Sequence, residues 1–392
     1  MQVENGDLVV FPQVIGTSRK ELDMETSIYK TITTYLLELI SRNVNTPNYK
    51  LPSERMLATN FNVSRKPVRH AYDDLIDRGY VTRIHGSGYY ISSSIDADQL
   101  QSSFQKRIKI SFIIPAVTTQ YSHALLSGVS DFCAKNRVEY TIHVSDDLPE
   151  KENSLIRSAS KTGSMGIILF PADNDAANYN ELARLAVRKF PFVLVDRRIP
   201  NFNTSFVASD DHQSMIDALQ FLFQRGYHNP VFVTPSPRSA SSIDSRINGY
   251  THGLLRFYKM ASPSNLLILS ENRSQHKNEV MQHLQKYPQT DVMILLGTKK
   301  TPVISALKGM GKNAIKLMLF DDELSHTERE TLKPFFILQD GYSIGYVAAE
   351  ILYNHILGDM RPSVRLFPVT IADADGNPLM PTEPIRRGAE PH

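Results

Sequence analysis

The chain has little of what a secreted or membrane protein needs. Its 392 residues contain one cysteine, so no disulfide can form within the chain, which fits a reducing cytoplasm. No apolar run approaches the roughly 18–20 residues that cross a bilayer. The N-terminal segment lacks the basic-then-apolar layout of a secretory signal. We therefore expect a cytoplasmic protein without a membrane partner.

Enzyme signatures are also missing. The sequence has no glycine-rich phosphate loop, no G-x-S-x-G, no H-E-x-x-H and no cysteine and histidine spacing that suits a metal ion. The twelve histidines are scattered, and Cys133 lies on an apolar helical stretch that favours core packing over nucleophilic catalysis. We therefore expect no enzyme, no cofactor and no metal site.

What the chain does contain is a pattern of two short helices and a glycine-tipped hairpin over residues 51–91. Ser53 and Ser64 stand where the N-caps of the two helices are expected. Pro67 suits the first turn of the second helix, and Gly79 suits its C-terminal end. This order of elements predicts a winged helix-turn-helix.

The second helix has one basic face and one apolar face. At about 100° per residue, an arc of roughly 140° holds the basic side chains Arg65, Lys66, Arg69 and His70. The adjoining arc holds the apolar side chains Val68, Ala71, Tyr72 and Leu75. An exposed basic face on the second helix of such a unit enters the major groove, where arginine can make bidentate contacts to guanine.

Positive charge is concentrated on this module. Residues 27–91 contain nine lysines and arginines against five aspartates and glutamates, a net +4, whereas the whole chain carries +2. A basic cluster usually means an ordinary solvated face, but this concentration on a suitable shape favours nucleic acid. The expected hairpin has His85-Gly86-Ser87-Gly88 at its tip, where glycines let the backbone approach a phosphate or a minor groove closely.

The motifs LPSER, NFNVSRKPVRHAYDDLIDRGYV and HGSGYYI together resemble the GntR family of bacterial transcription regulators. The resemblance implies that the arginines of the SER, SR and VR motifs contact operator DNA, with the glycines of the wing. The family usually has a small polar pair between the last two arginines, where this chain has Lys66-Pro67. This difference bears on which bases the protein prefers and not on whether it binds DNA. The candidate DNA-binding residues are Arg55, Arg65, Lys66, Arg69, His85 and Gly86.

From Lys109 onward, short apolar runs alternate with amphipathic ones. The first strand series is expected at 109–115, 138–144, 166–170 and 192–196, and a second series at 205–209, 230–234, 266–269, 291–296 and 315–320. Continuous apolar strands joined by helices predict buried parallel sheets. The two series predict an α/β domain of two Rossmann-like lobes, with ligands at the carboxyl ends of the strands, across a cleft.

Polar residues follow several of these strands, as in Asp196-Arg197, Asp210-Asp211 and Asp321-Asp322. Carboxylates that converge with an arginine can bind ligand hydroxyls through charge-assisted hydrogen bonds. The alternative is that these aspartates cap the following helices, and for Asp210, Asp211 and Asp322 that interpretation is at least as good. For Asp321 and for Arg246, near the start of its helix, the ligand interpretation is stronger.

The stretches VDRRIPNFNTSFVASDDHQSMIDALQFLFQRGYHNPVFVTP, SRINGYTHGL, LMLFDDEL and ILQDGYSIGYVAAEIL resemble the effector domain of the LacI/GalR family, which is built like periplasmic sugar-binding proteins. The resemblance implies sugar contacts by Arg246 and Asp321, with weaker placements for Asp196, Arg197, Tyr121 and Gln339. The family's usual Asn-Asp pair is replaced after the 291–296 strand by Gly297-Thr298-Lys299-Lys300. Lys299 or Lys300 would favour an acidic or phosphorylated sugar.

These patterns predict four segments in the chain: an N-terminal extension (1–26), a winged helix-turn-helix (27–91), a linker (92–107) and a sugar-effector-binding and dimerisation domain (108–392). The combination is similar to that of bacterial arabinose-repressor-type regulators. We expect a bacterial homodimer that binds a palindromic operator and represses carbohydrate-use genes until a sugar or sugar derivative binds. The alternatives are a DNA-binding head on an enzyme-like domain, a regulator whose cleft has lost sugar binding, and a sugar-binding protein without a DNA role.

Overall fold

The computed structural model describes residues 19–44, 46, 48–61, 63–93, 95, 108–172, 179–199, 202–235, 240–259, 262–296, 300–321, 324–380 and 386–387. The chain divides into two compact units, residues 1–105 and 106–392. The predicted linker, residues 92–107, lies mostly outside the described residues, as do residues 1–18 of the predicted N-terminal extension.

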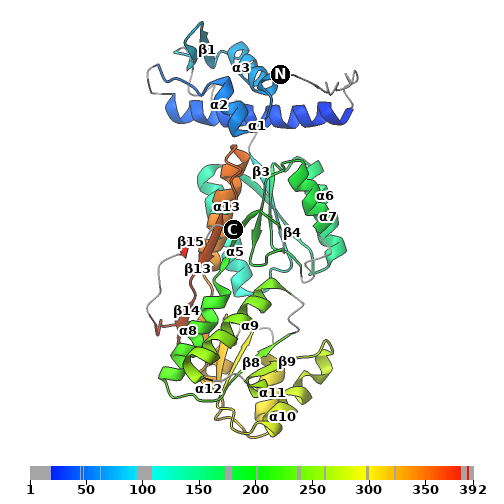
Figure 1. The fold of residues 1–392 in the computed structure, drawn as a ribbon, viewed down its shortest axis with the longest axis vertical. Coiled ribbons are helices and arrows are strands. Elements are labelled where there is room, and N and C mark those ends of the chain that lie inside the picture. Colours follow the sequence, from blue (N-terminus) through cyan, green and yellow to red (C-terminus); the bar gives the residue numbers. More distant parts are fainter. Residues whose placement is uncertain are drawn as a thin grey trace, which may run out of the picture. The chain divides into compact units, whose positions relative to one another are not determined.

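The first unit is a winged helix-turn-helix, as the sequence predicts (Figure 1). It contains α1 (Arg19–Asn43), α2 (Glu54–Asn60), α3 (Arg65–Asp77) and the antiparallel wing strands β1 (Val81–Ile84) and β2 (Gly88–Ile91). Ile32, Leu57, Val68 and Leu75 are fully buried in one core that joins α1, α2 and α3. Each helix alone would be marginal in water, so this shared apolar core stabilises the unit.

Local capping explains where these helices begin and end. The Ser53 hydroxyl accepts a hydrogen bond from the Met56 amide at 3.2 Å, and Gly79, just past α3, has φ +77°. Ser64 occupies the N-cap position of α3, but its side chain makes no capping hydrogen bond, so the prediction that it caps that helix is wrong in this respect. α1 begins at Arg19, inside the predicted extension.

The second unit contains two sheets, each forming one lobe (Figure 1). The first sheet has seven strands in the order β15-β13-β7-β6-β5-β3-β4, parallel except for β15. Their bounds are β3 Lys109–Ile114, β4 Glu139–Val144, β5 Gly166–Leu169, β6 Phe192–Val195, β7 Ser205–Ser209, β13 Val364–Phe367 and β15 Arg386–Arg387. α5 (Gln120–Asn136) and α13 (Gly341–Ile356) cover one face, and α6 (Pro149–Lys161) and α7 (Tyr179–Val187) cover the other.

The second sheet has six strands in the order β14-β12-β11-β10-β8-β9, parallel except for β14. Their bounds are β8 Pro230–Thr234, β9 Leu266–Ile268, β10 Val292–Leu296, β11 Lys316–Phe320, β12 Phe335–Leu338 and β14 Thr370–Ala372. α8 (Asp211–Gln224) and α9 (Ser241–Gly253) pack on one face, and α10 (His276–Lys286) and α11 (Lys300–Gly309) on the other, while α12 (His326–Leu332) connects β11 to β12. The predicted mixed α/β class with parallel sheets is therefore confirmed.

The chain crosses between the lobes more than once. It leaves the first sheet after β7, returns after β12 through α13, and then supplies β14 to the second sheet. The sequence pattern placed residues 205–209 at the start of the second series, which is wrong: β7 pairs with β6 and β13 in the first sheet. The residues of an apolar strand do not indicate which sheet the strand joins. The hydrophobic pattern therefore could not show that the chain crosses to the second lobe only after β7.

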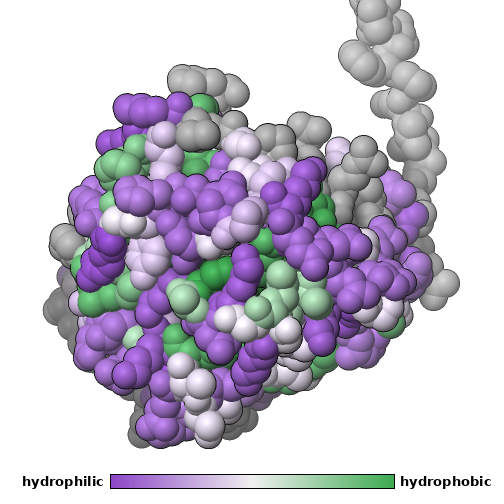
Figure 2. Space-filling model, turned by 90° about the horizontal axis from the view of Figure 1, so that it is seen from below, coloured by the Kyte–Doolittle hydropathy of each residue, from purple (hydrophilic) through white to green (hydrophobic). Residues whose placement is uncertain are grey.

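The surface of the second unit is mostly hydrophilic on the face drawn in Figure 2, where hydrophobic residues form separate patches. Scattered apolar side chains of this kind are ordinary on a protein surface. Within the described part of the chain, no helix is both long and apolar enough to span a membrane.

Candidate functional site

The first candidate site is the basic face of α3. Its four basic side chains, Arg65, Lys66, Arg69 and His70, are all exposed. The apolar side chains of the adjoining face, Val68, Ala71, Tyr72 and Leu75, are all completely buried. The helix therefore presents the arrangement that the sequence predicts, with its cations facing solvent.

The wing adds further groups to this surface. His85 and Gly86 lie exposed in the turn between β1 and β2, and Gly86 has φ +76°, a conformation that favours glycine. Arg55 is exposed on α2. Sequence reasoning did not single out Arg83, which is exposed on β1 with its guanidinium 5.5 Å from the ring centre of Tyr89. Arg83 lies among the exposed residues of β1, and this place on the wing strand is the sequence signal that could have identified it.

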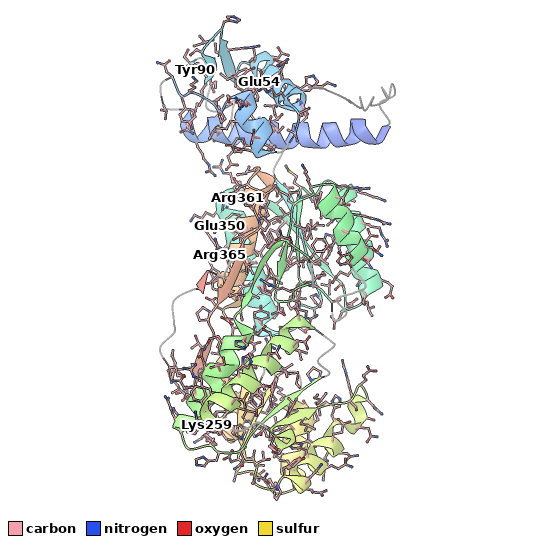
Figure 3. All side chains as sticks on the ribbon, in the orientation of Figure 1. Glu54, Tyr90, Lys259, Glu350, Arg361 and Arg365 are labelled. Atoms are coloured by element: carbon pink, nitrogen blue, oxygen red, sulfur yellow. The ribbon has the colours of Figure 1, made fainter. Side chains whose placement is uncertain are left out.

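Glu54, the first residue of α2 (labelled in Figure 3), connects the basic face to the wing. Its Oε2 accepts a hydrogen bond from Arg69 Nη2 at 3.1 Å, and its Oε1 accepts one from Tyr89 Oη at 2.6 Å. The Tyr89 ring stacks on Tyr72 with centroids 3.8 Å apart and planes 5° from parallel. Partial burial acts to raise the pKa of Glu54, but the hydrogen bonds from Tyr89 and Arg69 outweigh it and lower the pKa. Glu54 is thus a charged tether that orients Arg69.

Glu54→Ala should reduce discrimination between the operator and random DNA, although it removes a negative charge from a DNA-facing surface. Without the tether, Arg69 loses its fixed orientation and with it the geometry that bidentate base recognition requires. Glu54→Gln should retain more discrimination, because an amide oxygen still accepts one of the two hydrogen bonds. Competition binding with labelled DNA measures both effects.

The matched control for Glu54 is Glu38→Ala, which breaks a comparable pair with Arg42 on α1 at 2.6 Å. This control should leave discrimination unchanged. Equal or improved discrimination in Glu54→Ala would show that the carboxylate acts only as a repulsive charge.

The second candidate site is a largely buried polar cluster in the second unit, in which Asp321 and Gln339 are half-buried. It consists of Tyr121, Asp196, Asp211, Arg246, Asp321 and Gln339, and this set is called the polar cluster below. Arg246 is 7% exposed and donates from Nε to Asp211 Oδ1 at 2.7 Å. Its guanidinium also lies 4.1 Å from the ring centre of Phe320 and 3.4 Å, through Nη2, from Gln339 Oε1.

Asp321 and Gln339 continue this chain of contacts. Asp321 directly follows β11 with φ +56°, which directs its carboxylate back toward the residue after β12. There the Gln339 side-chain amide donates to Asp321 Oδ2 at 2.7 Å, and the Gln339 backbone amide donates to Asp321 Oδ1 at 3.3 Å. Gln339 therefore links Asp321 to Arg246.

Tyr121 and Asp196 bring the first lobe to the same place. Tyr121 is the second residue of α5, which follows β3, and Asp196 follows β6 with φ +64°. The Tyr121 hydroxyl is buried beside the Asp196 carboxylate. Burial raises the pKa of Tyr121 well above its usual value, and the carboxylates of Asp196, Asp321 and Asp211 raise it further. The two lobes thus contribute to one polar site.

Burial also makes two carboxylates of the cluster harder to ionise. Desolvation raises the pKa of Asp211 to about 7, against the lowering effect of Arg246. Desolvation likewise raises the pKa of Asp321 to about 6, against the hydrogen bond from Gln339. A ligand hydroxyl that donated to either carboxylate would replace the water lost on burial.

The remaining predicted positions lie at the margin of the cluster or away from it. Arg197 Nη1 donates to the Pro171 carbonyl at 2.8 Å and to Asp147 at 3.3 Å. The capping role goes to Asp210, which accepts from the Gln213 amide at 3.0 Å, while its neighbour Asp211 pairs with Arg246. Lys300 Nζ lies 3.5 Å from Glu328, and Lys299 and Asp322 lie outside the described residues.

Asp211 is the binding candidate that sequence reasoning undervalued. Its only signal was its place next to a strand end, which it shared with Asp210. Among the residues that the structure describes, no group of three or more histidine, cysteine, aspartate or glutamate side chains could hold a metal ion.

A glycine allows Arg246 to reach Asp211. α8 and α9 cross so closely that a Cβ on Gly249 would lie 2.1 Å from the His212 backbone oxygen. Gly249 follows Arg246 by one helical turn, so the spacing of the R-x-x-G motif places the arginine beside the point of closest approach. Only glycine fits there.

Gly249→Ala should lower the free energy of unfolding by about 1–3 kcal/mol, because the added methyl group overpacks this crossing. It should also weaken ligand binding, since α9 must move away from α8 and carry Arg246 with it. Urea denaturation measures the first effect. Gly309→Ala is the control, because nothing lies within 4 Å of the added carbon; equal stability of the two variants would contradict the close crossing.

Two family models match the chain. Residues 28–91 match the bacterial regulatory proteins of the gntR family, and residues 110–360 match the periplasmic binding protein domain. The expected GntR-type head and periplasmic-binding-protein-like body are therefore confirmed.

Curated relatives and solved structures agree with these matches. The HTH-type transcriptional regulator KdgR of Bacillus subtilis (strain 168) is 24% identical over 263 residues, covering 64% of this chain and 74% of that protein. An arabinose metabolism transcriptional repressor of Halalkalibacterium halodurans is 22% identical over 210 residues, covering 53% of this chain and 56% of that protein. The crystal structure of transcription regulator CcpA of Lactococcus lactis has a TM-score of 0.58 at 18% identity, covering 69% of this chain and 100% of that one, which shows the fold.

A winged helix-turn-helix with an exposed basic face, joined to a two-lobed α/β unit, defines a DNA-binding transcriptional regulator. The chain belongs to the periplasmic binding protein domain family through its second unit, and residues 28–91 match the family model of the bacterial regulatory proteins of the gntR family.

Proposed function

We propose that the protein is a bacterial cytoplasmic repressor of carbohydrate-use genes, released from its operator by a sugar or sugar derivative. The exposed basic residues of α3 and the wing bind double-stranded DNA, and the polar cluster binds the effector between the lobes. The protein acts without catalysis. In this proposal the DNA-binding head is residues 27–91, the linker is residues 92–107 and the effector domain is residues 108–392.

The polar cluster is the observation that supports effector binding most strongly. Fully buried ionic groups are costly, and a core that needed only stability would do as well with apolar side chains. Here Arg246, Asp211, Gln339 and Asp321 form a continuous chain of contacts, and the buried Tyr121 hydroxyl lies among the carboxylates of the cluster. Such convergent donors and acceptors at strand ends suit a ligand with several hydroxyls. The name of one relative, an arabinose metabolism repressor, favours a sugar.

The crossings between the lobes connect ligand binding to a change of shape. Asp211 begins α8, immediately after the chain leaves the first sheet, and Gln339 precedes α13, where it returns. A ligand held by both residues would bias the angle at these crossings. In a homodimer that change would respace two heads on a palindromic operator, whose half-sites lie near multiples of about 34 Å. Coupling of this kind is typically about 1–3 kcal/mol.

The test is a thermal-shift screen of the full chain against pentoses, hexoses, deoxyhexoses and their phosphates, followed by gel shifts on its own promoter DNA. A bound effector raises the melting temperature by mass action. We expect at least one sugar to raise the melting temperature and also to change the affinity for DNA. If no compound of the series shifts the melting temperature, the cluster is not a sugar site.

Arg65→Ala should weaken operator binding by about 1–3 kcal/mol and relax base preference, because Arg65 begins α3 on its exposed basic face. Fluorescence anisotropy with operator variants measures both effects. Arg78→Ala is the control: this arginine ends α3 and pairs with Asp74 at 2.8 Å. Unchanged discrimination between operator variants in Arg65→Ala would remove Arg65 from base recognition.

A further inference from the structure

The charge around the polar cluster is unbalanced. Three of its members are carboxylates, Asp196, Asp211 and Asp321, and one is a guanidinium, Arg246. All three carboxylates act electrostatically on Arg246, and Asp211 Oδ1 lies 2.7 Å from its Nε. Arg246 donates its best hydrogen bond to Asp211.

Arg197 does not restore the balance, because it belongs to a second acidic group. It pairs with Asp147 at 3.3 Å, while its Nε lies 3.9 Å from Asp196. It also acts on Glu152, which is completely buried and accepts from the Ala172 amide at 2.7 Å. Among the described residues, five acidic groups therefore neighbour these two arginines, although burial raises the pKa of Glu152 to about 7.

Buried hydroxyls lie at the same edge of the sheets. The Tyr121 side chain is 8% exposed, and the carboxylates of Asp196, Asp211 and Asp321 all act on its hydroxyl. Ser209 and Thr234, the last residues of β7 and β8, have buried hydroxyls without a partner in the described part of the chain. Buried polar groups are normally hydrogen-bonded, so these hydroxyls suit a hydroxyl-bearing ligand.

We infer that the cluster selects a neutral or cationic polyhydroxy compound, a sugar or an amino sugar, and rejects sugar acids and sugar phosphates. The inference rests on the proposed function. Carboxylates accept hydrogen bonds from ligand hydroxyls and ammonium groups. An added anion about 5 Å from one of them, at an effective dielectric constant of about 20, would bind on the order of a hundredfold more weakly.

For Lys300, the expectation that it favours an acidic or phosphorylated sugar gives way to this inference, and Lys299 lies outside the described residues. Lys300 lies against Glu328 and against the capping box of α12, away from the polar cluster's own contacts. Its positive charge is therefore compensated by a carboxylate outside the cluster.

The test compares matched ligands on the full chain by calorimetry and thermal shift. Each series contains a neutral sugar, its aldonic or uronic acid, its phosphate and, for the hexoses, its 2-amino derivative: glucose, gluconate, glucuronate, glucose 6-phosphate and glucosamine; the galactose equivalents; and arabinose, arabinonate and arabinose 5-phosphate. We expect a neutral or amino sugar to bind at least tenfold more tightly than its anionic counterparts. An acid or phosphate that binds more tightly than its neutral parent would overturn the inference and leave the sugar-responsive regulator intact. Failure of every series would overturn both.

Two variants test whether the carboxylates cause the discrimination. Asp196 and Asp321 have φ +64° and +56°, and asparagine adopts this left-handed conformation readily, so Asp196→Asn and Asp321→Asn should fold. Each should reduce the preference for the neutral over the acidic member of a series by at least tenfold. Circular dichroism melting verifies folding. An unchanged preference in both folded variants would show that these charges do not set the selectivity.

Discussion

Replacing Arg246 by alanine is expected to abolish the response to effector and to lower the free energy of unfolding by about 3–5 kcal/mol. The loss arises because Asp211, 6% exposed, would remain buried without its ion-pair partner. Gln339 would also lose its contact with Arg246, and the Phe320 ring would lose its cation–π contact with the guanidinium. The stability is measured by urea denaturation, and the response by DNA binding at increasing concentrations of the sugar that most raises the wild-type melting temperature.

The stability deficit of Arg246→Ala should depend on pH. Burial already raises the pKa of Asp211 to about 7 with Arg246 present, and loss of the guanidinium raises it further. An acid whose folded pKa exceeds its unfolded pKa binds its proton more tightly in the folded state, so falling pH favours folding. The deficit should therefore be larger at pH 8 than at pH 5.

Arg256→Ala is the matched control for Arg246→Ala. Arg256 is exposed and lies 5.2 Å from the ring centre of Phe257, outside the polar cluster. This control should leave both stability and effector response nearly unchanged. A response of Arg246→Ala at wild-type effector concentrations would show that the cluster is not the effector site.

Operator affinity should fall by roughly a thousandfold between 50 and 200 mM salt, if two heads together neutralise about six phosphates. The exposed cations of α3, α2 and the wing, including Arg55 and Arg83, supply this charge. Neutralised phosphates release counterions, so log affinity declines linearly with log salt concentration. Fluorescence anisotropy over a series of potassium chloride concentrations measures the slope.

A single variant provides the control for the salt series. Lys66→Ala should reduce the slope, because Lys66 is an exposed cation next to Arg65 on the DNA-facing helix. A wild-type affinity that does not vary with salt would mean that this basic face does not contact the DNA backbone.

The head was predictable from the sequence because its determinants are local. Ser53 caps α2, Gly79 ends α3 with positive φ, and the two faces of α3 follow from helical periodicity. Each signal depends on residues within about one turn of one another, so no knowledge of tertiary contacts was needed. The Glu54 tether was not predictable, because Arg69 and Tyr89 reach it from 15 and 35 residues away.

The effector domain was predictable in class but not in connection. Apolar strands and amphipathic helices gave the parallel sheets, but β7 looks the same in either sheet, and its place depends on pairing with β13, far along the chain. The sequence did not show whether Asp210 or Asp211 caps α8. In the structure Asp210 is the N-cap, and Asp211, the first residue of the helix, pairs with Arg246. The family resemblance predicted Arg246 and Asp321 as binding residues. The side chains that contact them could be identified only from the folded structure.

The most direct test of the regulator mechanism is one titration. The full chain is bound to fluorescent DNA from its own promoter, and the sugar that most raises the melting temperature is added while anisotropy is recorded. We predict that the sugar lowers DNA affinity by about 5- to 150-fold, as coupling of about 1–3 kcal/mol requires. A sugar that demonstrably binds the protein and leaves DNA affinity unchanged would contradict the coupling of head and effector domain.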